Sequence, residues 1–437
     1  MKDSWQKEKL DDLISNYLDF RGKTPLKLGM NWGGGDIRAL SANNVGKGKV
    51  DFEKECYYAS EALYKKWMNK GDCEKGDVLL TMEAPLGNVA QIPDDKKYIL
   101  SQRTILLKFK KTKVNKDFMF HLLSSEEFQR KLIKHSTGST VTGIQQKKLS
   151  KLEVCYPRLT DQSKIASILS TCDEVIEKTE AAIAKYQALK QGMMHDLFTR
   201  GIDVKKGKLR PSYKDAPELY KESELGMIPK EWEVKRIDDI LEKPIRDFGS
   251  FSMTNLIDFV DSGIPFLKTE VIQNGFIDFN KVSYITPNVH RLLYKSVVNK
   301  GDILFTKIGA IGRVAVYEGE IGTCNSNAAS AKINVNRSVD SYFIAFKLGS
   351  NRVIKDFEKS IISTPPRINL GEINAMQLEL PSLSEQIEIR KRIKSTIEKI
   401  KIEQSALAKY QQLKAGLMQD LLTGKAEVRA EEEILKN

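Results

Sequence analysis

The sequence predicts an α+β protein in which two similar halves each contain a mixed, strand-rich domain and one long helix. The strongest observation is an internal repeat: AKYQALKQGMMHDLFT (184–199) matches AKYQQLKAGLMQDLLT (408–423) at an offset of 224 residues. Farther upstream, GDVLLTMEAPLGNVA (76–90) matches GDILFTKIGAIGRVA (301–315) at an offset of 225. Because this period is far longer than that of a solenoid repeat, we expect two domains of one kind.

Short alternating apolar runs predict the strands of each domain. Val78–Met82 and Val89–Ile92 are separated by a segment that contains Gly87, as expected for a hairpin or a tight strand connection. Leu152–Tyr156 reads as a final strand that stops at Pro157. The second half repeats this pattern at Ile303–Thr306, Val314–Tyr317, Gly312, Met376–Leu380 and Pro381.

A long helix follows each of these prolines, predicted over residues 159–200 and 383–423. Thr160, Asp161 and Ser384 are suitable N-cap residues, and glycines follow the ends of both helices. Apolar residues recur at near-heptad spacing, which favours packing of helix on helix. The repeat also places Gly192 and Gly416 inside the helices, where we expect either a close approach of another backbone or a tolerated glycine.

Composition limits the classes of protein. The 437 residues suffice for two or three domains, and the net charge of +12 favours a polyanionic partner such as nucleic acid. No stretch approaches the roughly 18 apolar residues that span a bilayer, so we expect no membrane segment and a cytoplasmic protein. The cysteines form no CxxC pair and the four histidines are scattered, so we expect no metal site.

Enzymatic motifs are incomplete. Gly22-Lys23-Thr24 resembles the end of a phosphate-binding loop, but position 17 is Tyr17 where that motif needs glycine. Pro93-Asp94-Asp95-Lys96 lacks the further carboxylate of a metal-dependent nuclease. The Asn-Pro-Pro-aromatic motif of adenine methyltransferases and a Gly-x-Gly-x-x-Gly motif after a strand do not occur. We therefore expect a non-catalytic chain that binds no cofactor.

Four segments together resemble the specificity subunit of type I restriction-modification systems. They are LGMIPKEWEVKRIDDI (225–240), GDILFTKIGAIGRVAVY (301–317), LELPSLSEQIEI (378–389) and the helix ending AKYQQLKAGLMQDLLT (408–423). The resemblance covers nearly the whole chain, occurs twice, and is carried mainly by the order of the motifs.

This resemblance implies two target-recognition domains, each reading one half of a bipartite DNA sequence, separated by two long antiparallel helices with a pseudo-two-fold repeat. It also implies that the helices dock two copies of a DNA adenine methyltransferase subunit, which carries S-adenosylmethionine. Motor-nuclease subunits, which use ATP and Mg, would then assemble through these. The implied divisions are 1–158 (domain 1), 159–200 (helix 1), 201–224 (linker), 225–382 (domain 2), 383–423 (helix 2) and 424–437 (tail).

Polar residues in the expected loops are the candidates for DNA contact, because their donors and acceptors match base edges. For each, the competing interpretation is a turn former or a phosphate contact. The candidates are Arg21, Lys23, Ser41, Asn43, Asn44, Thr140, Thr142, Gln145, Lys268, Thr269, Lys307, Arg313, Thr364 and Arg367. The candidates for partner binding lie on the helices, where mutual packing is the alternative: Tyr186, Leu189, Met193, Tyr410, Leu413 and Leu417.

Three other functions compete with a specificity subunit. A stand-alone DNA-binding regulator would bind one sequence tightly without partner subunits. An enzyme acting on DNA is disfavoured by the missing motifs. Metal-dependent cleavage of DNA by the purified chain would support this hypothesis. A coiled-coil scaffold without DNA contact is disfavoured by duplicated polar loops in a basic chain.

Overall fold

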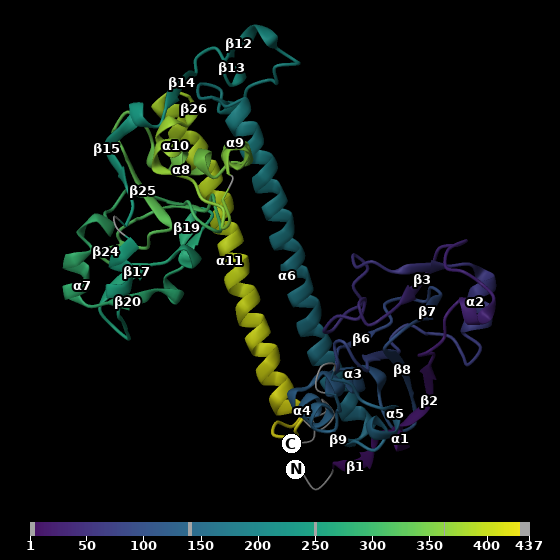
Figure 1. Ribbon diagram of the computed structural model, residues 1–437. Helices are drawn as coiled ribbons and strands as arrows, with labels where there is room; N and C mark the ends of the chain where they lie inside the picture. The colour runs from purple at the N-terminus through teal and green to yellow at the C-terminus, as the bar shows by residue number, and fades with distance from the viewer. Residues whose placement is uncertain (1–4, 139–141, 249–250, 362, 429–437) are drawn as a thin grey trace, which may run out of the picture. The chain divides into compact units, whose positions relative to one another are not determined.

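The computed structural model describes residues 5–138, 142–248, 251–361 and 363–428. The chain forms two compact units, the first from residues 1–180 and 405–437 and the second from residues 181–404. Each unit holds one globular module together with segments of the two long helices, α6 (Leu159–Thr199) and α11 (Leu383–Leu421) (Figure 1). The predicted α+β class, with two mixed modules and two long helices, is confirmed. No helix among the described residues has the length and apolar character needed to cross a membrane.

The first module contains a four-stranded antiparallel sheet in the order β2-β8-β5-β6. A second, three-stranded sheet has the order β4-β3-β7, in which β3 runs parallel to β7. The strands are β1 (Gln6–Lys9), β2 (Ile14–Asp19), β3 (Ile37–Leu40), β4 (Tyr57–Ala59), β5 (Val78–Thr81), β6 (Val89–Gln91), β7 (Tyr98–Leu100), β8 (Thr104–Phe109) and β9 (Glu153–Tyr156), of which β1 pairs with β9.

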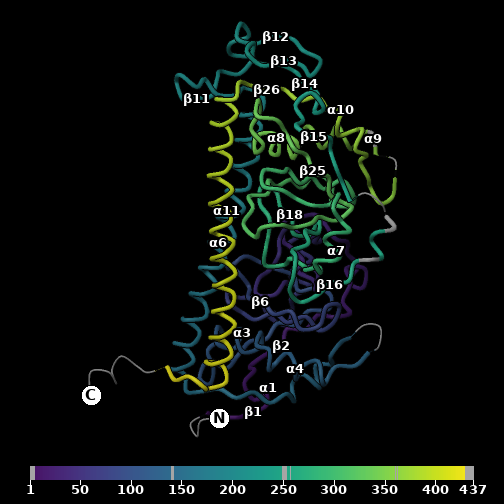
Figure 2. The backbone as a smooth tube through the Cα atoms, turned by 90° about the vertical axis from the view of Figure 1, so that its left-hand side faces the viewer, coloured from purple at the N-terminus to yellow at the C-terminus, as the bar shows by residue number. Residues whose placement is uncertain are grey.

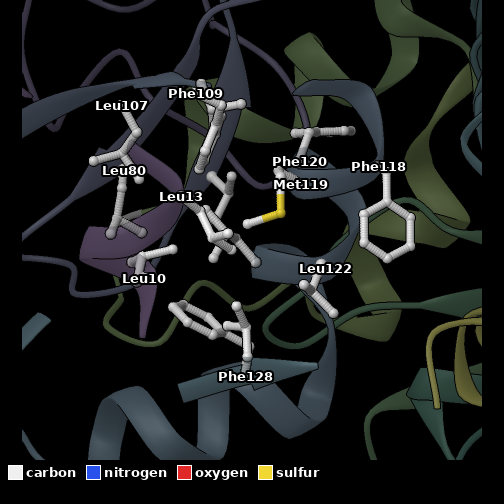
Figure 3. Close-up of a cluster of buried hydrophobic side chains, with 14 of the residues drawn as sticks. Leu10, Leu13, Leu80, Leu107, Phe109, Phe118, Met119, Phe120, Leu122 and Phe128 are labelled. Carbon is white, nitrogen blue, oxygen red and sulfur yellow. The ribbon is translucent and has the colours of Figure 1, made fainter. Parts of the chain in front are cut away.

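Short helices close the core of this module. They are α1 (Leu10–Leu13), α2 (Glu61–Trp67), α3 (Lys116–Ser124), α4 (Glu126–Lys134) and α5 (Gln146–Leu149). Figure 3 shows how Leu10 and Leu13 meet the sheet residues Leu80 and Leu107 and the α3 residue Met119. Ile165 and Leu169 of α6 and Leu421 of α11 belong to the same buried cluster, so burial of apolar surface attaches both helices to the module.

The second module repeats this plan. Its four-stranded sheet has the order β15-β25-β22-β23, and its five-stranded sheet has the order β16-β20-β17-β24-β21, in which β17 runs parallel to β24. The strands are β14 (Glu233–Arg236), β15 (Leu241–Arg246), β16 (Phe259–Val260), β17 (Ile264–Leu267), β18 (Ile272–Gln273), β19 (Phe276–Ile277), β20 (Ser283–Ile285), β21 (Val297–Val298), β22 (Ile303–Thr306), β23 (Val314–Val316), β24 (Cys324–Ser326), β25 (Ser330–Val335) and β26 (Gln377–Leu380). The helices are α7 (Pro287–Leu292), α8 (Ser341–Leu348), α9 (Asn351–Ser360) and α10 (Leu370–Ala375).

Short 3₁₀ helices connect these elements. They are Leu26–Leu28, Pro217–Leu219, Asp238–Ile240, Phe251–Leu256, Thr269–Val271, Phe279–Lys281 and Tyr294–Ser296.

A buried glutamine fastens the start of each long helix to its module in the same way. Gln162 accepts a hydrogen bond from the backbone N–H of Asn115, the N-cap of α3, and donates to the carbonyl of Pro157, both at 2.8 Å. Gln386 makes the equivalent bonds to the Asp340 N–H and the Pro381 carbonyl, also at 2.8 Å. The repeat seen in the sequence is therefore also a repeat of buried hydrogen bonds.

The two helices pack antiparallel within each unit. In the first unit Leu169 shares a core with Leu421, and four residues later Asp173 pairs with Lys414. In the second unit the Thr396 hydroxyl lies 3.9 Å from the Met193 sulfur. Figure 2 shows α11 as one uninterrupted helix. A Cβ added at Gly192 or Gly416 would meet no described atom within 4 Å, so no neighbouring backbone in the described part of the chain approaches either glycine closely.

The segment after α6, expected as a linker, is folded. It forms two hairpins, β10 (Ile202–Asp203) with β11 (Lys208–Leu209) and β12 (Tyr220–Ser223) with β13 (Gly226–Pro229). Arg210 donates to both carboxylate oxygens of the buried Glu385, at 2.5 and 2.9 Å. The same carboxylate accepts from the backbone N–H of Ile202 at 2.7 Å, which fixes the segment against the start of α11.

Candidate nucleic-acid interface

In each module one pair of parallel strands brings two loops together. The strands β3 and β7 end at the same edge of their sheet, where the Ser101 N–H donates to the Leu40 carbonyl at 2.8 Å. The Ala42 N–H then donates to the Gln102 carbonyl at 3.2 Å. The predicted loop 41–44 therefore lies beside residues 101–103, which the sequence did not single out.

The second module has the same arrangement. The strands β17 and β24 are parallel, and the Asn327 N–H donates to the Leu267 carbonyl at 3.1 Å. The predicted residues Lys268 and Thr269 thus lie beside residues 327–329. Because the carboxyl ends of parallel strands meet at one edge, both modules build this surface by the same topology.

A third loop joins the surface in each module. The Met82 N–H donates to the Arg103 carbonyl and the Lys307 N–H to the Ala329 carbonyl, both at 2.8 Å. These bonds place the loops 82–88 and 307–313, which connect β5 to β6 and β22 to β23, next to the parallel pair. We call these three loops the loop surface of each module: 41–44, 82–88 and 101–103 in the first, and 268–270, 307–313 and 327–329 in the second.

The candidates near the last strands lie beside the third loop. In the first module the Ile144 N–H donates to the Met82 carbonyl at 3.0 Å; Thr142 and Gln145 are exposed, and Thr140 lies outside the described residues. In the second module the Ile368 N–H donates to the Lys307 carbonyl at 2.9 Å, so Thr364 and Arg367, both exposed, come next to the loop that holds Arg313.

Several predicted residues are occupied by internal partners. Asn44 is only 1% exposed; its side-chain oxygen accepts from the Ser41 N–H and hydroxyl, and its amide donates to the Lys54 and Glu55 carbonyls. Because its polar atoms are satisfied inside the module, Asn44 shapes the loop and is not available to a base edge. Asn43 beside it is exposed and makes one side-chain bond, to the Glu55 carbonyl at 3.3 Å.

Three positively charged side chains that were predicted to contact DNA also have internal partners. The Arg21 guanidinium donates to both oxygens of Asp19, and the Lys23 ammonium donates to the Trp67 carbonyl at 2.7 Å and to Asn69 at 2.9 Å. The Lys307 ammonium is buried 3.4 Å from an Asp247 oxygen; burial lowers the pKa of Lys307, and the charge of Asp247 opposes that shift. These side chains are better placed to hold loops than to meet bases.

Exposed aromatic side chains, which the sequence analysis missed, flank the loop surface. In the first module Trp32 and Tyr57 stack with ring centroids 5.2 Å apart, and Tyr57 is 62% exposed. Both line a hollow that also contains Lys23, Asn43 and Gln102. In the second module the Lys268 ammonium lies 4.1 Å from the centroid of the exposed Phe259 ring. Residue type alone does not separate such aromatics from core aromatics, so the sequence held no signal for them.

The partner-binding candidates divide by exposure. Leu189 in the second unit and Leu413 in the first occupy matched positions and are each 56% exposed. Tyr410 is also exposed, whereas Tyr186 is half-buried. Met193 and Leu417 are half-buried and pack against the cores of their own units, which favours mutual packing for these two.

Solved structures show which proteins share this fold. The crystal structure of a type I restriction-modification system S subunit from M. genitalium aligns over 95% of this chain and 96% of its own, with a TM-score of 0.60 at 16% identity. A structure reported for the complex assembly and conformational transition of the type I R-M system aligns over 96% and 98%, with a TM-score of 0.51 at 14% identity.

Sequence comparisons extend the likeness. The chain is 26% identical over 408 residues to the type I restriction enzyme MjaVIII specificity subunit of Methanocaldococcus jannaschii, covering 87% of this chain and 88% of that one. It is 24% identical over 306 residues to the EcoBI specificity subunit of Escherichia coli, covering 68% and 61%. The family described as type I restriction modification DNA specificity domain matches residues 2–185 and again residues 229–413. Since that match covers both modules and most of the chain, the chain belongs to the non-catalytic DNA specificity subunits of type I restriction-modification systems.

Proposed function

We propose that the loop surface of each module, with the segment that adjoins its third loop, makes the contacts to one half of a bipartite DNA target. One observation carries this assignment: three backbone hydrogen bonds that assemble the surface recur at equivalent positions of both modules, while the side chains on it differ. A constant frame with variable exposed side chains is what two modules need in order to read different half-sites.

The domain limits follow from this assignment. The first recognition domain takes residues 1–158 and the second residues 225–382, and the helices take 159–200 and 383–423. Residues 201–224 link the halves and residues 424–437 form the tail.

The helices dock two copies of a DNA adenine methyltransferase subunit in this proposal. A pair of identical partners needs two equivalent surfaces, and the exposed Leu189 and Leu413 supply matched apolar positions within the repeated segments 184–199 and 408–423. S-adenosylmethionine belongs to these partners, ATP and Mg belong to motor-nuclease subunits, and the assembly acts on double-stranded DNA in the cytoplasm.

Methylation mapping tests the DNA contacts proposed for the two loop surfaces. The chain is co-expressed with its methyltransferase subunit, and modified adenines are sequenced on a plasmid library. We expect a split motif in which the pair Asn43→Ala and Thr142→Ala relaxes one half and the pair Thr364→Ala and Arg367→Ala relaxes the other. A stand-alone regulator is supported instead if no adenine is modified and the chain alone binds one sequence tightly.

Native mass spectrometry tests the docking surfaces. We expect Leu189→Lys or Leu413→Lys to reduce the bound methyltransferase copies from two to one, and the double variant to bind none. Ile402→Lys is the matched control, because Ile402 is 59% exposed on α11 but corresponds to Lys178 in α6 and so lies outside any duplicated apolar surface. Retention of two copies by the double variant would contradict this assignment.

A further inference from the structure

The two loop surfaces differ at one pair of residues that equivalent backbone hydrogen bonds align. Ser101 and Asn327 donate to the last residue of the first parallel strand, and the carbonyls of Arg103 and Ala329 each accept from the third loop at 2.8 Å. These equivalent bonds on either side align the residues between them, so Gln102 of the first module corresponds to Ala328 of the second. One module therefore has a carboxamide where the other has a methyl group.

Gln102 is free to meet a ligand. Its side chain is exposed, and no hydrogen bond joins its amide group to another of the described residues. It also lines two adjoining hollows, one with Trp32 and Tyr57 and the other with Pro85 and Asn88. By contrast, Asn44, Arg21 and Lys23 on the same module have internal partners.

The neighbouring residue has an unusual backbone. Arg103 has φ of +65°, a left-handed conformation that only one other non-glycine residue in the described ranges adopts. Its guanidinium lies 3.5 Å from a Glu83 oxygen. Strain of this kind persists where the surrounding structure enforces it, and it clusters at binding sites. The backbone hydrogen bonds on either side of Gln102 supply that enforcement and hold the backbone of Gln102 in place.

We propose that Gln102 is a specificity-determining residue of the first module and that its carboxamide recognises adenine in one A·T pair of one half-site. This rests on the proposed function of the loop surface. A carboxamide offers one donor and one acceptor side by side, which matches the N7 acceptor and N6 donor of adenine in the major groove. When the DNA covers this surface, a base that cannot pair with the carboxamide leaves it desolvated and without a partner, which costs affinity.

The second module reads the equivalent position without a hydrogen bond. Ala328 offers only a methyl group there, so discrimination at that position passes to neighbours such as Lys268. The two half-sites consequently differ in how strictly they require a base at equivalent places.

The test uses the complex with the methyltransferase subunit and the same plasmid library, with gel-shift competition against duplexes that carry each of the four bases at the assigned position. We expect Gln102→Ala to reduce the preference for adenine there roughly ten- to hundredfold. Gln102→Glu should transfer the preference to cytosine, because a carboxylate accepts from the cytosine N4 amino group. Both variants should leave the other half-site unchanged.

Ala328→Gln is the reciprocal variant, and we expect it to add base discrimination in the other half-site only. If the wild-type complex yields no split motif, the proposed function fails and this inference fails with it. If the wild-type motif is split but Gln102→Ala and Gln102→Glu keep the full adenine preference, only the role of Gln102 is overturned. Since Gln102 is exposed and its side chain has no hydrogen bond with the residues that the structure describes, its replacement leaves the fold intact.

Discussion

The Glu385 carboxylate is buried at the junction of three chain segments, and its charge is balanced mainly by Arg210. Removing one partner of a buried ion pair leaves the other charge uncompensated, which costs about 3–5 kcal/mol. We therefore expect Glu385→Ala to destabilise the hairpin segment 202–229. Hydrogen exchange with mass spectrometry should show loss of amide protection there, and calorimetry should show a lower melting temperature.

Glu231 provides the control for this prediction. It also binds the Arg210 guanidinium, at 2.7 Å, but its side chain is 77% exposed. Exposed ion pairs contribute at most about 1 kcal/mol, so Glu231→Ala should change protection little. Equal effects of the two substitutions would show that burial does not set the strength of this interaction.

His121 makes the first unit sensitive to acid. The ring is buried beside α6 and α11: Nε2 lies 3.2 Å from the Ser170 hydroxyl, while Nδ1 has no hydrogen-bond partner among the described residues. Burial lowers the pKa of His121 to about 3, and the nearby charge of Lys414 adds to the effect. The Asp173 oxygen 3.9 Å away is too distant to reverse it. The ring is therefore neutral in the folded protein over the physiological range of pH.

The sign of the pH effect follows from these values. An unfolded histidine has a pKa of about 6.5, so below that pH the unfolded chain binds a proton that the folded chain excludes. The contribution of the neutral ring to the free energy of unfolding has its full value above pH 6.5 and decreases toward pH 3. At pH 4 the free energy of unfolding is lower by about 3 kcal/mol. We expect His121→Phe, which installs the residue found at the matched Phe346, to flatten this dependence in urea unfolding. Parallel pH profiles for the two proteins would contradict the assignment.

Residue type alone was the basis for predicting the site residues, and it does not show whether a polar side chain has a partner inside the protein. Asn43 and Arg367 are exposed beside the loop surface, as a polar residue in a loop suggests. Asn44 and Lys307 are of equally suitable type but have internal partners, and a sequence does not show a partner that is distant along the chain. Gln102 was missed because its position depends on the parallel pairing of β3 with β7, about 60 residues apart.

Among the secondary-structure elements, the helices and strands with a periodic apolar pattern were predicted best. The long helices were expected at 159–200 and 383–423 and occur at Leu159–Thr199 and Leu383–Leu421. The hairpins β5–β6 and β22–β23 and the strands β9 and β26 also occur where expected. The hairpin β10–β11 escaped prediction because its strands have two residues each, too few for a periodic pattern, and because a polar sequence concealed the burial of Arg210.

The exposed glycines of the helices give a prediction about partner docking. Gly192 and Gly416 follow Leu189 and Leu413 by three residues and therefore lie on the same helix faces. Since a Cβ would meet no atom of the described residues within 4 Å, Gly192→Ala and Gly416→Ala should each stabilise the free chain by about 0.5–1 kcal/mol. We expect the same changes to weaken binding of the methyltransferase subunit, because a helix that packs closely at glycine would meet the new methyl groups. Calorimetric melting and titration measure the two effects, and unchanged binding would identify both positions as tolerated glycines.

For the whole molecule, the internal repeat predicted two domains but not the composition of the compact units. Each unit combines a module with the start of one long helix and the end of the other, so residues as distant as Leu10 and Leu421 share one core. A repeat in the sequence does not specify which helix end completes which core. That depends on the antiparallel packing of the helices, which only the resemblance had implied.

The separate cores lead to a prediction about the complete target. Gln102 and Lys268 belong to different units, each with its own buried clusters and loop surface. Free-energy changes at sites without shared contacts add to within about 0.3–0.5 kcal/mol. We therefore expect the loss of DNA-binding free energy in the double variant Gln102→Ala, Lys268→Ala to equal the sum of the single losses, measured in the methyltransferase complex by competition binding at constant salt. A coupling energy well above about 0.5 kcal/mol would show that the half-sites are read jointly, through the DNA or through the helices that the two units share.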